Sequence, residues 1–122
     1  MIKLIYSFRK RAELSDEEFD RYWRDVHGPI GARIPGLRRL VHSKTIRIPG
    51  DARAPDYDGV AELWFDDVES LLAARKSEEW RHSGLDEAYF IDPASTRYAV
   101  TEERTIPTAS PGNDAPLRSA RG

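Results

Sequence analysis

Apolar residues recur with two different periods along this chain, and the order of those periods restricts the fold more than any other feature. A period of two is typical of a β-strand with one buried face, whereas helical spacing is typical of an amphipathic helix. The period of two occurs in residues 2–9, 38–48, 57–65 and 96–103. Helical spacing occurs between the first and second of these segments and between the third and fourth, so the predicted order is β-α-β-β-α-β.

Capping signals mark where the two helical segments begin. Ser15 followed by Glu18 forms a capping box, and the apolar stripe behind it contains Phe19, Tyr22, Trp23, Val26 and Ile30. The Gly28-Pro29 pair is predicted to break or kink this helix, because proline lacks an N–H and crowds the preceding turn. Asp66 with Glu69 predicts the second start, followed by a short, broken helical stretch through Trp80 and Phe90.

This order predicts an α+β domain of the ferredoxin-like type, with a four-stranded antiparallel sheet and both helices on one face. The opposite face of the sheet carries Val41, Val60 and Trp64. A sheet that is apolar on both sides needs cover on both sides. We therefore expect a homodimer that forms through the sheet faces.

Composition excludes several classes of partner and site. The 122 residues carry a formal net charge of −2 and no cysteine, which argues against nucleic acid or an anionic membrane as partner and excludes disulfides and thiolate chemistry. The chain shows no signal-peptide or membrane-span pattern, so a cytoplasmic location is expected. Residues 1–104 are predicted to form the domain. Residues 105–122 lack periodicity and are predicted to form a flexible C-terminal tail.

Histidine is the side chain best suited to proton transfer near neutral pH, and the chain has three. His27 lies at the edge of the aromatic stripe, where it is either a proton-transfer group or a cap for the last carbonyls of the helix. His42 lies within a strand, as a second proton-transfer group or as a polar residue at the rim of the sheet. His82 lies among polar residues and is predicted to be exposed, without a role.

The remaining candidate residues are aromatic or acidic. Tyr22 is a candidate catalytic hydroxyl, and Tyr6, Phe8 and Trp23 are candidates for binding a flat, apolar substrate. Glu62 lies between apolar residues in a strand, so it is predicted to pair with Lys3 or Arg97; the alternative is an orienting carboxylate or general base. No phosphate loop, nucleophile elbow or metal-ligand spacing is present. We therefore expect neither a metal nor a cofactor.

Several blocks of sequence resemble the EthD family. They are SDEEFDRYWRDVHGP (residues 15–29), YDGVAELWFD (57–66) and DEAYFID (86–92), together with the leading strand, and the resemblance spans nearly all of residues 1–104. It implies a ferredoxin-like monomer that pairs into a dimeric α/β barrel. The resemblance also implies that His27, in the Tyr-Trp-x-x-x-His-Gly-Pro element, is the acid or base of catalytic members.

Family resemblance leaves the reaction open. The family includes proteins named for ethyl tert-butyl ether degradation, enzymes resembling muconolactone isomerases, and dehydratases or decarboxylases of polyketide pathways. We expect a cofactor-independent lyase or isomerase that acts on a small aromatic, lactone or polyketide-like carbonyl compound, with His27 moving the proton. The alternatives are a cofactor-free monooxygenase of the same barrel type, or a non-enzymatic protein that binds haem or a hydrophobic metabolite.

Overall fold

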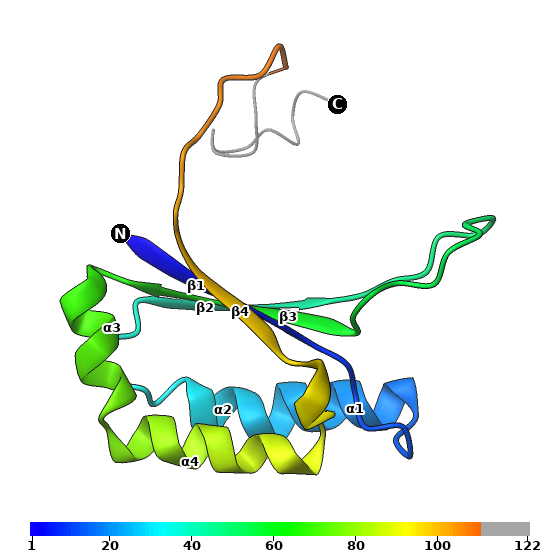
Figure 1. Ribbon diagram of the computed structural model, residues 1–122, viewed down its shortest axis with the longest axis horizontal. Helices are drawn as coiled ribbons and strands as arrows, with labels where there is room; N and C mark the ends of the chain where they lie inside the picture. The colour runs from blue at the N-terminus through cyan, green and yellow to red at the C-terminus, as the bar shows by residue number, and fades with distance from the viewer. Residues whose placement is uncertain (111–122) are drawn as a thin grey trace.

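The computed structural model describes residues 1–110 and confirms the predicted order of elements (Figure 1). Strands β1 (Ile2–Phe8), β2 (Arg39–Lys44), β3 (Gly59–Phe65) and β4 (Arg97–Glu102) form one antiparallel sheet in the order β2-β3-β1-β4. The register places Tyr6 opposite Ala61 and Tyr98. Because side chains alternate along a strand, Tyr6 and His42 then lie on the same face of the sheet.

The first helical segment begins as the capping box predicts but is not broken at Gly28-Pro29. Helix α1 (Asp16–Tyr22) continues through a π-helical turn (Trp23–His27) into α2 (Gly28–Gly31). In the π turn the N–H of Gly28 donates to the carbonyl oxygen of Trp23. Widening by one residue just before Pro29 accommodates a residue that has no N–H to donate, so the chain continues as a helix.

The second helical segment is divided in two. Helix α3 (Val68–Arg75) precedes α4 (Glu78–Asp86), and short 3₁₀ turns follow at Glu87–Tyr89 and Pro93–Ser95. The predicted start at Asp66 is wrong by one residue, because Asp67 caps α3 by accepting from the N–H of Ser70. Asp66 instead pairs with Arg38 at 2.8 Å.

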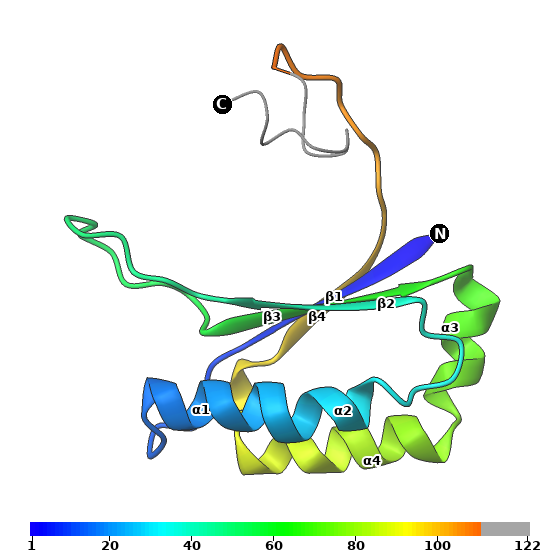
Figure 2. The ribbon, with the colours of Figure 1, turned by 180° about the vertical axis from the view of Figure 1, so that it is seen from behind.

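All the helices lie on one face of the sheet, as predicted (Figure 2). The core fills the space between the two layers, and its largest fully buried side chains are Trp23, Phe8, Phe65, Phe90, Leu71 and Ile91. Gly59 allows the Trp23 ring to pack directly against the backbone of β3, since a Cβ atom at Gly59 would lie 2.8 Å from two atoms of that ring. The helix that carries Trp23 is thereby held close to β3.

The outer face of the sheet is more polar than the sequence suggests. Lys3 pairs with Glu62 at 2.8 Å, which confirms the predicted ion pair across the strands. Trp64 is only 7% exposed, because Lys3 and Arg39 lie over its ring and its indole N–H donates to Glu103 at 2.7 Å. Charged side chains of the same chain therefore already cover Trp64 on this face.

Two segments extend away from the two layers in Figure 1. One is the connection between β2 and β3, and the other is formed by residues 103–110 after β4. Residues 103–110 contain no helix or strand. The rest of the predicted tail, residues 111–122, lies outside the described residues. Within residues 1–110, no helix is long and apolar enough to cross a bilayer.

Candidate active site

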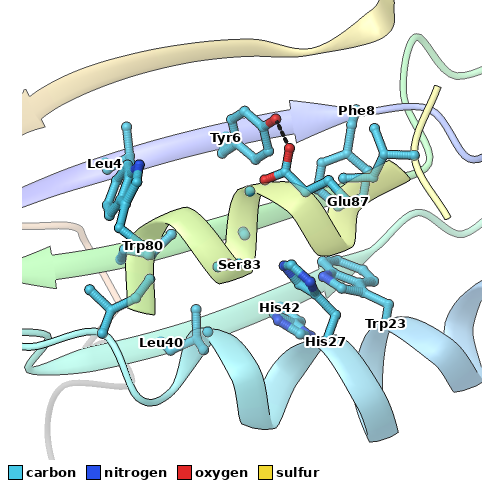
Figure 3. Close-up of a pocket in the computed structure, with 16 residues that line it drawn as sticks. Leu4, Tyr6, Phe8, Trp23, His27, Leu40, His42, Trp80, Ser83 and Glu87 are labelled. Atoms are coloured by element: carbon cyan, nitrogen blue, oxygen red, sulfur yellow. Dashed lines mark hydrogen bonds between the residues drawn. The ribbon is translucent and has the colours of Figure 1, made fainter. Parts of the chain in front are cut away.

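A cavity of about 270 Å³ lies between the helices and the sheet. Most of its lining is apolar, and the polar side chains that reach it are Tyr6, His27, His42, Ser83 and Glu87. Figure 3 shows His27, His42 and Trp23 at one end of this cavity and Leu4 and Trp80 at the other. An apolar pocket with a few convergent polar groups is typical of a small-molecule site.

His27 forms a hydrogen bond to a carboxylate at the edge of the cavity. Its Nδ1 atom lies 2.9 Å from Oδ2 of Asp86, and the two side chains are only 12% and 8% exposed. Since a carboxylate can only accept, Nδ1 carries the proton and Nε2 presents its lone pair. His27 is therefore not a helix cap, because the helix continues past it and its ring nitrogen bonds to α4 instead.

A second hydrogen bond holds the carboxylate of Asp86 in place. The hydroxyl of Tyr22 donates to Oδ1 of Asp86 at 2.7 Å, so both carboxylate oxygens have donors. Burial and the neighbouring Asp86 carboxylate raise the pKa of Tyr22 to about 12. The hydroxyl therefore remains a donor at neutral pH. Through Asp86, hydrogen bonds link Tyr22 to His27, and these bonds hold α1, the π turn and α4 in place relative to one another.

The charge state of His27 follows from burial. Removal of the ring from water lowers the pKa of His27, and this effect exceeds the opposing influence of Asp86. The imidazole is therefore neutral at pH 7. A neutral imidazole with Nδ1 held by a carboxylate is the form that accepts a proton at Nε2.

His42 lies on the sheet side of the same cavity. Its ring stacks on Trp23, with ring centroids 4.2 Å apart and planes at 13°. Burial, with repulsion from His27, lowers the pKa of His42 to about 4. His42 is thus neutral over the physiological range and can give or accept a hydrogen bond at the cavity wall.

A second carboxyl group lines the cavity next to Asp86. Glu87 accepts a hydrogen bond from the hydroxyl of Tyr6, with 2.8 Å between the oxygens (Figure 3). Burial raises the pKa of Glu87, and the charge of Asp86 acts in the same direction. Burial and Glu87 together raise the pKa of Tyr6 well above its usual value. Asp86 and Glu87 therefore each supply a carboxyl group, and each carboxyl group accepts a hydrogen bond from a different tyrosine.

The structure brings together most of the side chains that the sequence singles out. Tyr6, Phe8, Trp23, His27 and His42 line the cavity. Tyr22 lies behind it, where it contacts Asp86. Glu62 does not line the cavity, because it lies on the outer face of the sheet with Lys3. His82 is exposed, as predicted.

Sequence reasoning missed Asp86 and Glu87 as site residues, although a signal was present. Both lie at the end of α4, where the helix dipole disfavours negative charge. Acidic residues at that end do not stabilise the helix itself, which indicates that they interact with residues of other elements. No group of three or more metal-ligand side chains gathers within residues 1–110.

Comparison with solved structures agrees with this fold. The first match is an ethyl tert-butyl ether degradation (EthD) family protein of Bacillus halodurans, at 28% identity and a TM-score of 0.71, covering 85% of this chain and 99% of that chain. A dimeric ferredoxin-like protein of unknown function from Bacteroides fragilis matches at 15% identity and a TM-score of 0.61, covering 84% and 95%.

One similar fold has a described activity. SnoaB, a cofactor-independent oxygenase from Streptomyces nogalater, matches at 13% identity and a TM-score of 0.58, covering 86% of this chain and 94% of that chain. At this identity the likeness concerns the fold alone. The family model of the EthD domain matches residues 11–94, which include the helix of His27 and the carboxyl groups of α4 and its following turn. The chain therefore belongs to the EthD family.

Proposed function

We propose that this protein is a cofactor-independent lyase or isomerase that acts by general acid–base catalysis on a small, apolar carbonyl compound. The observation that carries the proposal is the 2.9 Å contact between Nδ1 of His27 and Asp86. That contact leaves Nε2 as the basic atom of a neutral histidine, and the side chain of His27 lines an apolar cavity. An imidazole held in one tautomer in this way is a general base with a fixed direction.

The chemistry proposed for the site is proton transfer at a carbon atom next to a carbonyl group. Nε2 of His27 removes the proton, and Asp86 stabilises the imidazolium that forms. The same imidazolium returns the proton to another atom of the substrate, which gives an isomerisation, or to a leaving group, which gives an elimination. General acid–base help of this kind is worth about 10²–10⁴ in rate, which suits an already activated carbonyl compound.

The cavity walls support a flat apolar substrate. Trp23 and Phe8 form much of one end, and Leu63 and Trp80 extend the apolar surface. A volume of about 270 Å³ lies just below the usual range for drug-sized ligands, which starts at about 300 Å³. The proposed substrate is therefore a compact ring compound.

A cofactor-free monooxygenase is the second candidate, and the fold shared with SnoaB is the observation that favours it. The first step would be the same, because His27 would deprotonate an anthrone-like substrate before it reacts with oxygen. Oxygen uptake separates the two functions. An electrode trace that stays flat during turnover would exclude the monooxygenase.

We also propose that two copies pair through the outer face of the sheet. Val41 and Val60 are half-buried there, and the similar protein from Bacteroides fragilis is described as dimeric. Val60→Asp places a charge on that face and is expected to shift the protein from dimer to monomer in analytical ultracentrifugation. A wild-type chain that sediments as a monomer at micromolar concentration would contradict the dimer.

The experiment for the main function uses 2-tetralone, an uncharged bicyclic ketone, in D₂O. Wild-type protein is expected to accelerate deuterium exchange at the carbon next to the carbonyl, as followed by proton NMR. His27→Ala should lose most of this acceleration, about 10²–10⁴-fold. His82→Ala is the matched control, because His82 is exposed and outside the cavity. Equal rates in wild type and His27→Ala would contradict the proposal.

A further inference from the structure

Glu87 places a carboxyl group in an apolar setting, where the hydroxyl of Tyr6 donates to it. Its side chain lines the apolar cavity. The residue follows directly after α4, at the end of the helix where the dipole disfavours negative charge. Among the ion pairs formed by residues 1–110, none involves Glu87. A buried carboxyl group without a cation gains little by being ionised.

The hydrogen bond from Tyr6 distinguishes the two carboxyl oxygens of Glu87, because only one of them accepts it. Oε1 accepts from the tyrosine hydroxyl at 2.8 Å, so it is the oxygen without the proton. A proton on Glu87 then resides on Oε2. Burial raises the pKa of Glu87 more than the hydrogen bond from Tyr6 lowers it, and the adjacent Asp86 acts with burial, so the balance shifts toward the protonated form. The carboxylic acid can donate to an oxygen atom of a bound ligand.

We propose that Glu87 is a second catalytic residue, which donates a proton to the carbonyl oxygen of the substrate while His27 removes the proton from carbon, and that this substrate carries no charge. This inference rests on the proposed function of His27. It adds the identity of the acid in the reaction and the net charge of the ligand, which is zero. Tyr6 is the positioning residue for Glu87, as Tyr22 is for Asp86.

The proposed step balances without any further reactant. The C–H bond beside the carbonyl breaks and its proton goes to Nε2 of His27. The released electron pair forms a carbon–carbon double bond, and the electrons of the C=O π bond move to the oxygen. That oxygen takes the proton from Oε2 of Glu87, which leaves a carboxylate that Tyr6 stabilises. In a substrate with a second C=C bond conjugated to the enol, the proton of His27 goes to the far carbon of that bond, the electrons shift back to re-form the C=O bond, and the enol proton returns to Glu87, which completes an isomerisation.

The charge of the lining supports an uncharged ligand. None of the described side chains that line the cavity is a lysine or arginine. A substrate carboxylate or phosphate would therefore enter an apolar space without a cation, next to Asp86 and Glu87. Burial of an unpaired anion is strongly unfavourable. Ketones and lactones without an acidic group fit, whereas lactones that carry a carboxylate do not.

Infrared spectroscopy tests the protonation of Glu87 without any substrate. At about pH 6, a carboxylic acid C=O band is expected in the wild-type difference spectrum against Glu87→Gln. The same band should persist in His27→Ala and in Glu62→Gln, whose carboxylate lies on the outer face of the sheet. Loss of the band only in Glu87→Gln supports the proposal. Its absence from the wild type would overturn it.

Deuterium exchange of 2-tetralone then tests the catalytic role. Glu87→Gln is expected to slow exchange at least about tenfold and Glu62→Gln to leave it unchanged. Tyr6→Phe should slow exchange less than Glu87→Gln, because it removes only the positioning hydrogen bond. If His27→Ala abolishes exchange but Glu87→Gln does not affect it, this inference is overturned and the function of His27 stands. If His27→Ala exchanges like wild type, the function of His27 is overturned as well.

Binding of two probes with the same ring tests the charge of the ligand. 2-Naphthol is uncharged at neutral pH, whereas 2-naphthoate is an anion. By calorimetry, 2-naphthol is expected to bind at least about tenfold more tightly than 2-naphthoate. Equal or tighter binding of 2-naphthoate would overturn the proposal of an uncharged substrate.

Discussion

Asp86 and Glu87 are neighbours in sequence, yet their carboxyl groups hydrogen-bond to side chains of different elements. Asp86 accepts from His27 and Tyr22 in the first helical segment, whereas Glu87 accepts from Tyr6 on β1. The end of α4 therefore connects the helical layer to the sheet beside the cavity that Glu87 lines. In the proposed mechanism, Asp86 orients the base, His27, and Glu87 is the acid.

Removal of the charge of Asp86 should impair His27 without removing the ring. In Asp86→Asn the amide can donate to Nδ1, which favours the tautomer with the proton on Nε2. We expect a loss of about 10²–10⁴ in the rate of 2-tetralone exchange, measured by proton NMR. Asp66→Asn is the control, since Asp66 pairs with Arg38 on the surface. A rate within twofold of wild type in Asp86→Asn would contradict the assigned role.

The hydroxyl of Tyr22 should contribute to stability, because it satisfies a buried carboxylate. Tyr22→Phe is expected to lower the free energy of unfolding by about 1–3 kcal/mol, measured by urea denaturation. Tyr89→Phe provides a matched change at a residue that is 68% exposed and should stay within about 0.5 kcal/mol of wild type. Equal stabilities of the two variants would show that the hydrogen bond to Asp86 contributes nothing.

Close packing at Gly59 gives a prediction about the helix of His27. A Cβ atom at Gly59 would lie 2.8 Å from the Trp23 ring, whereas no heavy atom lies within 4 Å of a Cβ at Gly84. Gly59→Ala should therefore lower the free energy of unfolding by about 1–3 kcal/mol. Gly84→Ala, within α4, should raise it or leave it unchanged, by at most about 1 kcal/mol. Thermal and urea unfolding measure both, and the reverse order of stabilities would refute this packing argument.

Acidification should destabilise the protein through its buried histidines. Burial lowers the pKa of His42 to about 4 in the folded state, whereas the unfolded chain takes the usual value of about 6.5. Between these values the unfolded state binds more protons, so the free energy of unfolding falls as the pH falls from about 6.5 to about 4. The lowered pKa of His27 adds to this slope.

Urea denaturation at a series of pH values measures the effect, and His42→Gln should flatten the slope. His82→Gln should leave the slope as in the wild type, because His82 is exposed in the folded protein. A slope that is unchanged in His42→Gln would show that the buried state of His42 does not control stability in this range.

Much of the fold could be predicted from the sequence because its signals are local. Alternation along residues 2–9 identified β1, and the Ser15–Glu18 capping box identified the start of α1. The passage of the helix through Gly28-Pro29 could not be predicted, because it depends on a π turn that is stabilised by packing against the sheet. Local sequence gives no information about that packing.

The candidate site was predictable only in part, for the same reason. His27 and the aromatic residues stand out by residue type and spacing, whereas Asp86 and Glu87 look like surface residues of a polar helix. Their roles depend on partners 59 and 81 residues away. The sequence predicts Tyr22 as a catalytic hydroxyl and Tyr6 as a substrate-binding residue, whereas in the structure both hydroxyls donate to carboxyl groups. No local pattern indicates that choice of partner.

The central claim is that His27 is a neutral base whose Nε2 lone pair is available to a ligand. Nitrogen-15 NMR of the histidine side chains, recorded through a pH titration, tests this claim most directly. His27→Gln identifies the His27 signals. The structure predicts a proton on Nδ1, a bare Nε2 and a pKa below the ordinary value of about 6.5. A proton on Nε2 at neutral pH, or a pKa above that value, would contradict the account.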